Sequence, residues 1–220
     1  MVFDVDCVLV DVHGSFHRSI LETVRHFTGW RVSRNDIHRW KNRSGYNDDW
    51  TLTHHWILAL GHRASYAAVK RKFQQIYWGN HFDGNVARER WLLPRAALRR
   101  LARRYELGIF SGRTRQELRH TFKKFGVGSY FRRVVVRDHV RQPKPDPEGL
   151  LRILDGRDPR SALYVGDNVD DAIAARRAGI PFVGVLPRAS VARRLRASRL
   201  RRLGAKFVLS NIRDLEKHLA

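Results

Sequence analysis

The first residues of this chain place carboxylates where a strand ends. The stretch VFDVDCVLVD, residues 2–11, reads as a buried β-strand that runs into Asp4 and Asp6, with Asp11 following. Taken alone, two acids spaced in this way are more often turn formers or helix caps than a catalytic pair. Their meaning therefore depends on the side chains at the ends of the other strands.

Polar side chains of matching chemistry follow three later strand-like segments. They are Ser111 and Gly112 in IFSGR, Lys144 in RQPKPDPEG, and Asp167, Asp170 and Asp171 in YVGDNVDD. Ligands of an open parallel sheet bind beyond the carboxyl ends of its strands. We therefore expect these groups to gather with Asp4 at one edge of a sheet.

Carboxylates gathered at one edge repel one another and raise each other's pKa values unless a cation lies among them. Oxygen ligands of this kind suit Mg²⁺. A dianionic phosphate would then complete the site, held by the cation, the lysine and the hydroxyl. The pattern predicts Mg²⁺ as cofactor and a phosphorylated ligand.

Strand and helix signals alternate after residue 90, which predicts an α/β fold with a doubly wound parallel sheet. Strands are expected at 105–112, 134–136, 162–167, 181–186 and 205–210, and helices at 94–104, 114–126, 146–154, 169–179 and 211–219. The helix at 114–126 has the clearest limits, because Thr114 and Glu117 form a capping box and Gly126 ends it.

The segment between the first strand and residue 90 differs in composition and in hydrophobic pattern from the rest of the chain. Residues 14–90 hold five of the six tryptophans and seven of the eleven histidines, in helical patterning. Residues 19–29 and 65–79 are its clearest helices, and the polar stretch 41–57 leads into another. This predicts a helical cap subdomain at 14–90, inserted into a core of residues 1–13 and 91–220.

The composition is strongly basic, with 43 Lys and Arg against 21 Asp and Glu and a net charge of +22. Residues 188–203 carry seven arginines and no acid. Val191, Leu195, Leu200 and Leu203 give this stretch an apolar stripe, so we expect an amphipathic helix far from the site, with a solvated arginine face. Nucleic-acid binding through that surface is possible but not favoured.

Length and composition exclude several classes of protein. The 220 residues, 43% of them hydrophobic, support a packed core. No run of 18 apolar residues is present, and the acidic start is unlike a signal peptide, so we expect a cytoplasmic protein with no membrane segment. The single cysteine, Cys7, reads as a small packed hydrophobe.

Four motifs in order give the chain a specific resemblance. DVDCVLVD resembles the first motif, D-x-D-G-[TV]-L, of the haloacid dehalogenase superfamily; FSGR resembles the second, KPDPEG the third and GDNVDD the fourth. With the insertion after the first strand, the chain resembles the capped phosphatases of subfamily IA, near the phosphoglycolate phosphatases. The resemblance covers nearly the whole chain and implies a Rossmann-like core.

The resemblance also implies catalytic roles for the two opening acids. Asp4 would be the nucleophile that accepts the phosphoryl group as an aspartyl phosphate. Asp6 would protonate the leaving alkoxide and then deprotonate the attacking water.

The same resemblance implies the residues that hold the metal and the phosphate. Asp4 and Asp167 would bind Mg²⁺ together with the backbone carbonyl of Asp6, and Asp171 would assist through water or orientation. Ser111, the Gly112 amide and Lys144 would bind phosphate oxygens. The expected partner is a small phosphorylated metabolite.

Two positions depart from the family pattern. Cys7 and Pro143 stand where glycines are usual. A Cβ at residue 7 is expected to crowd the turn after Asp6. Only Val2 and Phe3 precede Asp4 in the first strand, so the natural start could lie upstream.

Several alternatives stay open at this stage. Asp6 argues against a dehalogenase, whereas a sugar phosphomutase would retain both acids and a similar cap. A non-catalytic member that binds nucleic acid through its arginines is the alternative from a different class. No pattern in the sequence identifies the specific substrate or the oligomeric state.

Substrate specificity is assigned to the polar loop of the inserted segment. The candidates are Arg43, Asn47, Asp48 and Trp50, with Asp49 beside them. An N-cap before the next helix is an equally weighted reading of the acids in this loop.

Overall fold

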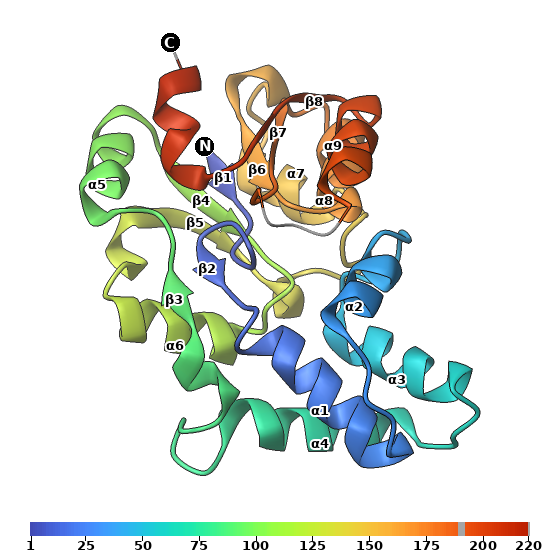
Figure 1. Cartoon of the computed structure of the whole chain (residues 1–220). Coiled ribbons are helices and arrows are strands. Elements are labelled where there is room, and N and C mark those ends of the chain that lie inside the picture. The colour runs from blue at the N-terminus through green and yellow to red at the C-terminus, as the bar shows by residue number, and fades with distance from the viewer. Residues whose placement is uncertain (189–191, 220) are drawn as a thin grey trace. The chain divides into compact units, whose positions relative to one another are not determined.

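The computed structural model describes residues 1–188 and 192–219 (Figure 1). The chain divides into two compact units. Unit 1 comprises Met1–Val10 with Trp91–Ala220, and unit 2 comprises Asp11–Arg90. Of the described residues, no helix is long and apolar enough to cross a membrane.

Unit 1 is built on a six-stranded parallel sheet with the order β5-β4-β1-β6-β7-β8. Its strands are β1 (Val2–Phe3), β4 (Leu107–Phe110), β5 (Phe131–Val135), β6 (Tyr164–Gly166), β7 (Phe182–Val185) and β8 (Ala205–Leu209). The strand β1 lies between β4 and β6, so the order of the strands reverses there. The predicted doubly wound α/β fold is confirmed.

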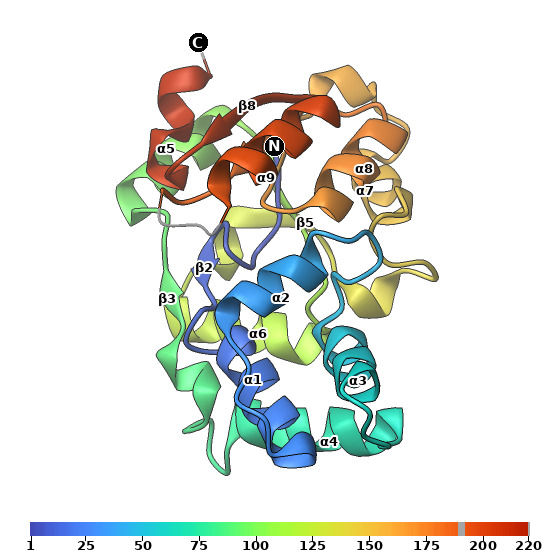
Figure 2. The same cartoon turned by 45° about the vertical axis from the view of Figure 1, so that its right-hand side comes forward.

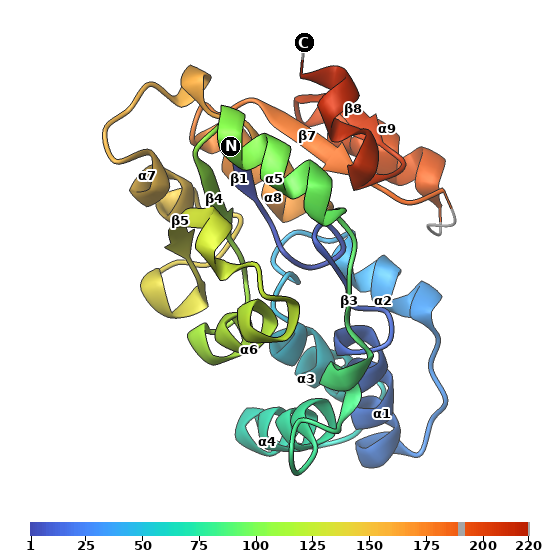
Figure 3. The ribbon, with the colours of Figure 1, turned by 90° about the vertical axis from the view of Figure 1, so that its left-hand side faces the viewer.

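Helices cover both faces of this sheet, with α5 on one side and α8 and α9 on the other (Figures 1, 2 and 3). The helices of unit 1 are α5 (Arg95–Arg104), α6 (Arg115–Phe125), α7 (Glu148–Leu154), α8 (Val169–Arg177) and α9 (Arg193–Arg202). Alternate strand residues face opposite layers. Val2, Phe110 and Tyr164 join the core under α7, α8 and α9, whereas the Phe3 ring contacts Phe131 on the other face.

Local sequence signals explain the helix ends. At α6, the Thr114 hydroxyl accepts from the Glu117 amide at 3.3 Å, and the Glu117 carboxylate accepts from the Thr114 amide at 2.7 Å. Gly126 ends this helix with a φ of 59°, as predicted. The helix predicted at 211–219 is instead a 3₁₀ helix, Ile212–His218.

The first strand is short, as the two residues before Asp4 indicate. It ends at Phe3, and residues from Asp4 form a loop in which the Cys7 amide donates to the Val10 carbonyl at 2.8 Å. Cys7 has a φ of 60°, a left-handed conformation that glycine adopts without strain. The expectation that a side chain here strains the turn therefore has a geometric basis.

The arginine-rich helix differs from its prediction. In α9 the buried residues are Arg196, Ala197 and Leu200, whereas Leu195 is 73% exposed. The predicted apolar stripe is therefore wrong at Leu195, and Val191 lies outside the described residues. An arginine takes the place expected of a leucine on the packed face.

Unit 2 is a helical bundle made of α1 (Phe16–Thr28), α2 (Arg34–Lys41), α3 (Asp49–Ala59) and α4 (Tyr66–Trp78). Helix α1 packs against α3 and α4, with the Phe16 ring stacked on Tyr77 at 4.3 Å between centroids. The buried Glu89 accepts hydrogen bonds from Tyr77 and Ser15 at 3.0 and 3.2 Å. The chain enters and leaves this unit through the paired strands β2 (Val10–Asp11) and β3 (Arg90–Trp91).

Gly149 marks the closest approach of α7 to the sheet. A Cβ at this position would lie 2.1 Å from the Phe110 ring. We expect Gly149→Ala to lower the free energy of unfolding by about 1–3 kcal/mol, because overpacking outweighs the helix propensity of alanine. Urea unfolding measures this, and Leu151→Ala, on the exposed side of the same helix, is the control. Equal stability of Gly149→Ala and the parent would refute the close packing.

Candidate active site

Strand register brings the predicted side chains to one edge of the sheet. Phe3 pairs with Ile109 of β4 and with Val165 of β6, so the residues that follow these strands emerge together. The Asp4 amide donates to the Val165 carbonyl at 2.8 Å, and the Asp4 carboxylate accepts from the Val5 amide at 2.8 Å. Asp4 is 3% exposed, which places a carboxylate in the interior.

Lys144 supplies the cation beside this carboxylate. Its Nζ lies 3.1 Å from Asp4 Oδ1 and 2.7 Å from Asp171 Oδ1. It also donates to the Tyr164 hydroxyl at 3.0 Å and to the Phe110 carbonyl at 3.3 Å. The ammonium is thus surrounded by four oxygens: one from β4, one from β6, one from α8 and one from Asp4, the residue that follows β1.

Burial and charge act in opposite directions on these groups. Burial raises the pKa of Asp4 well above its usual value, although Lys144 acts to lower it. Burial alone would lower the pKa of Lys144, but Asp171 and Asp4 outweigh burial and raise it. Burial and the Asp171 carboxylate keep the pKa of Tyr164 well above its usual value. Lys144 is therefore a permanent cation, and Tyr164 a neutral donor.

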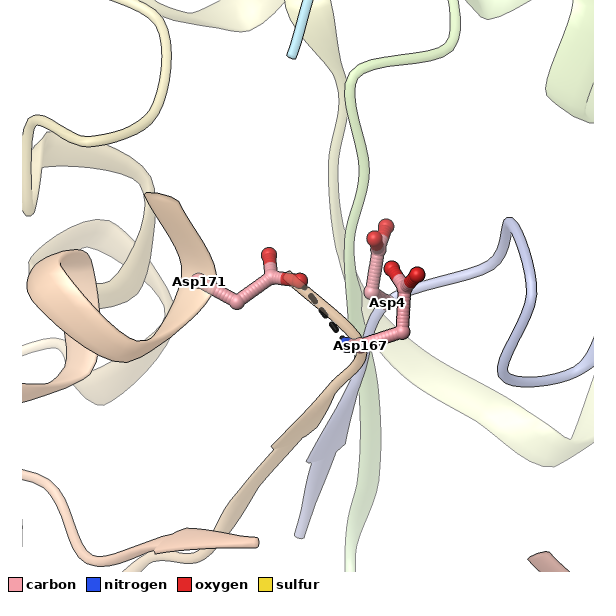
Figure 4. Close-up of side chains that lie close together, drawn as sticks. All are labelled: Asp4, Asp167 and Asp171. Atoms are coloured by element: carbon pink, nitrogen blue, oxygen red, sulfur yellow. Dashed lines mark hydrogen bonds between the residues drawn. The ribbon is translucent and has the colours of Figure 1, made fainter. Parts of the chain in front are cut away.

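The Asp171 carboxylate holds several neighbouring groups in place through hydrogen bonds. Its Oδ2 accepts from the Asp167 amide at 3.0 Å (Figure 4) and from the Asn168 amide at 3.2 Å, and its Oδ1 accepts from the Tyr164 hydroxyl at 2.8 Å. Gly166 allows this approach, because a Cβ there would lie 2.6 Å from the Asp171 side chain. Both oxygens of Asp171 are thus engaged in holding neighbouring groups.

The carboxylates form an oxygen cluster that fits a hard cation. One oxygen from each of Asp4, Asp167 and Asp171 lies within 4.8 Å of the others. Asp4 and Asp167 point in the same direction, whereas Asp171 lies to one side (Figure 4). An all-oxygen donor set is the kind that Mg²⁺ and Ca²⁺ prefer, and few protein ligands leave room for water and phosphate, which favours Mg²⁺.

Arg196 reaches this cluster from α9. Its Nη2 lies 3.6 Å from Asp167 Oδ2 and donates to the Asp167 carbonyl at 3.4 Å. The side chains of both residues are largely buried, at 9% and 14% exposure. The expectation that this helix lies far from the site is therefore wrong for Arg196, because a long side chain spans the distance that its backbone does not.

Two of the groups predicted to bind phosphate, Ser111 and Gly112, lie directly after β4. Ser111 is 1% exposed, and its Oγ accepts from the Arg113 amide at 3.2 Å, while Gly112 is exposed. Arg113 also contacts Asp6, with Nε and Nη2 at 2.8 and 2.7 Å from Oδ1. Asp6 is 27% exposed in its side chain, so it is accessible where Asp4 is not.

Besides Arg196, Tyr164 and Arg113 belong to the site but were not predicted from the sequence. Tyr164 stands in a buried apolar strand, and a tyrosine in such a place needs a polar partner, which was a usable signal. Arg113 directly follows Ser111 and Gly112, but nothing local shows that its guanidinium turns inward.

The specificity candidates all belong to unit 2. Asp48 caps α3 by accepting from the Thr51 amide at 2.8 Å, and Trp50 is buried with the Lys70 ammonium 4.0 Å from its ring centre. The exposed Arg43 lies over the Trp40 ring at 5.2 Å and lines a pocket of about 350 Å³ with Trp56. Asn47 is half-buried. The structure brings Arg43 to an aromatic pocket and gives Asp48 a capping role.

Residues 1–185 match the haloacid dehalogenase-like hydrolase family. The chain belongs to this family. The match includes all four motifs and the segment inserted between the first and the second. The resemblance stated from those motifs is confirmed.

Individual relatives agree with this assignment. The chain is 34% identical over 195 residues to an imidazoleglycerol-phosphate dehydratase of Phytophthora nicotianae, which covers 84% of this chain and 43% of that protein. It is 41% identical over 83 residues to the pyrophosphatase PpaX of Bacillus velezensis, covering 37% of this chain and 38% of that protein. These matches therefore span less than half the length of each relative.

A solved structure shows the same fold across the whole chain. It is that of a predicted phosphoglycolate phosphatase from Haemophilus somnus, with a TM-score of 0.78 and 20% identity, covering 100% of this chain and 96% of the other.

Because Arg196 contacts Asp167, its replacement should affect Mg²⁺ binding, whereas replacement of exposed arginines in the same helix should not. We expect Arg196→Gln to tighten Mg²⁺ binding by a few-fold, because a buried cation next to a carboxylate of the cluster opposes a second cation. Isothermal titration with MgCl₂ measures the affinity. Changing Arg194, Arg201 and Arg202 to Gln, all exposed, should leave it unchanged. Weaker Mg²⁺ binding by Arg196→Gln would show that orientation of Asp167 outweighs repulsion.

Proposed function

We propose that this chain is a Mg²⁺-dependent phosphatase that hydrolyses a small phosphomonoester through an aspartyl phosphate on Asp4. The observation that carries the proposal is a buried carboxylate at the end of the central strand, 3.1 Å from a buried ammonium. Family membership and relatives named as a pyrophosphatase and a phosphoglycolate phosphatase support it.

In the first step an oxygen of Asp4 attacks phosphorus, and the bond from phosphorus to the ester oxygen breaks. Asp6, in its protonated form, gives its proton to that leaving oxygen. In the second step Asp6 takes a proton from water, whose oxygen attacks phosphorus. The bond between phosphorus and Asp4 then breaks, which releases phosphate and restores both carboxyl groups.

The charge on the transferring group is balanced by fixed cations and donors. Lys144, the Ser111 hydroxyl and the Gly112 amide would bind the phosphoryl oxygens. Lys144 also holds Asp4 Oδ1 at 3.1 Å, so it fixes the nucleophile before substrate arrives. Such prior placement lowers the entropic cost of reaching the transition state.

The proposed ligands of Mg²⁺ are the carboxylates of Asp4 and Asp167 and the backbone carbonyl of Asp6. When bound, Mg²⁺ would neutralise charge so that a dianionic phosphate can approach the carboxylates. Asp171 would act by orientation, since it already accepts bonds from Lys144, Tyr164 and two amides.

We propose that residues 14–90 form a cap subdomain that selects the substrate, and that residues 1–13 and 91–220 form the core subdomain that carries the catalytic residues. Arg43, Asn47, Asp48 and Trp50 are proposed specificity residues, with Asp48 acting mainly through the capped helix. We propose a small phosphorylated metabolite as substrate and a cytoplasmic site of action.

Metal removal tests the oxygen cluster. Hydrolysis of an aryl phosphate should require Mg²⁺ and cease in excess chelator, because the clustered carboxylates otherwise repel the substrate. Release of inorganic phosphate is the readout, and readdition of MgCl₂ is the control for reversible loss. Full activity in chelator would refute this assignment. A nucleic-acid-binding role would instead appear as RNA or DNA affinity that falls steeply with salt.

Substitutions of Asp4 and Asp6 should impair different steps of the reaction. Asp4→Asn leaves an amide that cannot form an acyl phosphate, so no phosphoenzyme should appear. Asp6→Asn keeps the nucleophile but loses the proton donor and later the base, so turnover should fall about 10²–10⁴-fold. With an activated aryl phosphate the first step needs little protonation, so phosphoenzyme should accumulate in Asp6→Asn.

Intact-protein mass spectrometry after a rapid acid quench detects the added phosphoryl group in each variant. Asp11→Asn is a control, because Asp11 lies on the same segment but pairs with Arg90 at 2.8 Å in unit 2. A phosphoryl adduct on Asp4→Asn, or parental turnover in Asp6→Asn, would contradict these assignments.

A further inference from the structure

Asp6 lies beyond the reach of the strand that precedes it. Strand β1 ends at Phe3, and the loop that follows turns through the left-handed Cys7. The pleat of a strand fixes side-chain direction only while the strand lasts. Another contact must therefore set the direction of the Asp6 carboxylate.

Arg113 makes that contact from the short segment between β4 and α6. Its side chain is fully buried, with 0% exposure, and both Nε and Nη2 reach the same oxygen, Asp6 Oδ1, at 2.8 and 2.7 Å. Two N–H groups on one rigid guanidinium restrict both the position and the rotation of the carboxyl group.

The guanidinium is itself anchored on helix α6. Its Nη1 donates to the Thr121 hydroxyl, which donates in turn to the Glu117 carbonyl of α6 at 3.0 Å. The Arg113 amide donates to Ser111 Oγ at 3.2 Å, and its carbonyl accepts from the Arg137 amide at 2.9 Å. Arg113 is therefore a fixed part of unit 1, and it holds Asp6 and Ser111 in one connected set of hydrogen bonds.

We propose that Arg113 is a positioning residue for Asp6, holding Oδ1 so that Oδ2 exchanges the proton with the leaving oxygen and then with water. This inference rests on the proposed function, because it takes Asp6 as the acid and base. The side chain of Asp6 remains 27% exposed, which leaves the carboxyl group open to substrate while the guanidinium behind it is closed to solvent. Arg113 acts through Asp6 and does not act on the phosphate.

Arg113→Lys keeps the charge but cannot place two N–H groups on one oxygen. We expect kcat to fall about 10–10²-fold with KM little changed, since a loss of orientation affects the proton-transfer step. The loss should be larger for an alkyl phosphate than for an activated aryl phosphate, and phosphoenzyme should accumulate as in Asp6→Asn. Arg119→Lys, exposed on α6, is the matched control.

A double variant separates action through Asp6 from a general structural effect. If Arg113 works only by placing Asp6, then Asp6→Asn with Arg113→Lys should be no slower than Asp6→Asn alone, within about threefold. Additive losses would overturn the inference, as would parental kcat in Arg113→Lys. If the kcat of Asp6→Asn equals that of the parent, the proposed function itself is wrong. This outcome differs from additive losses in the double variant, which would contradict only the role of Arg113.

A second variant covers the case in which Arg113→Lys does not fold. Thr121→Val retains the arginine and nearly the same side-chain volume but removes the hydroxyl that anchors Nη1. It should show a smaller loss of kcat with the same dependence on the leaving group. Parental kcat and no dependence on the leaving group in Thr121→Val would overturn the inference in that case.

Discussion

The buried ammonium of Lys144 is the interaction on which the rest of the site depends. It lies between Asp4 and Asp171, two carboxylates that are almost wholly removed from water. Without it these charges would repel each other in a medium that screens them poorly, and removal of one partner from a buried ion pair typically costs about 3–5 kcal/mol. Tyr164 and the Phe110 carbonyl complete the coordination of the ammonium, so no donor of Lys144 is left without an acceptor.

The sheet is arranged to make this ion pair possible. Phe110 and Tyr164 belong to β4 and β6, Asp4 directly follows β1 between them, and Lys144 comes from the segment after β5. Gly166 and Gly149 supply the space, the first for the Asp171 carboxylate and the second for the Phe110 ring. The strand register fixes where Asp4 emerges beside Phe110 and Tyr164, because backbone hydrogen bonds join β1 to β4 and β6.

The sequence predicts this structure best where interactions between neighbouring residues determine the local conformation. The capping box at Thr114 and Glu117 and the stop at Gly126 depend on neighbouring residues, and α6 has the predicted limits. The motifs at strand ends predict which groups gather, because parallel strands share an edge. The loop that begins at Asp4 was not predictable in this way, since apolar residues alternate with the acids in VFDVDCVLV past the point where pairing stops at Phe3. Arg113 and Arg196 depend on contacts between distant segments, which no local pattern encodes. Arg196 shows this best, because a charged residue in a basic helix gives no sign that it will be buried against Asp167.

The carboxylate cluster lies in a chain whose net charge is +22. A field of that sign draws phosphorylated anions toward the protein and opposes the approach of divalent cations, since long-range potentials act on ligands before any contact forms. Dissolved salt weakens both effects together. Rising ionic strength therefore slows the arrival of one ligand of the site and speeds the arrival of the other. The protein's response to its ionic surroundings consequently depends on which of the two is scarce.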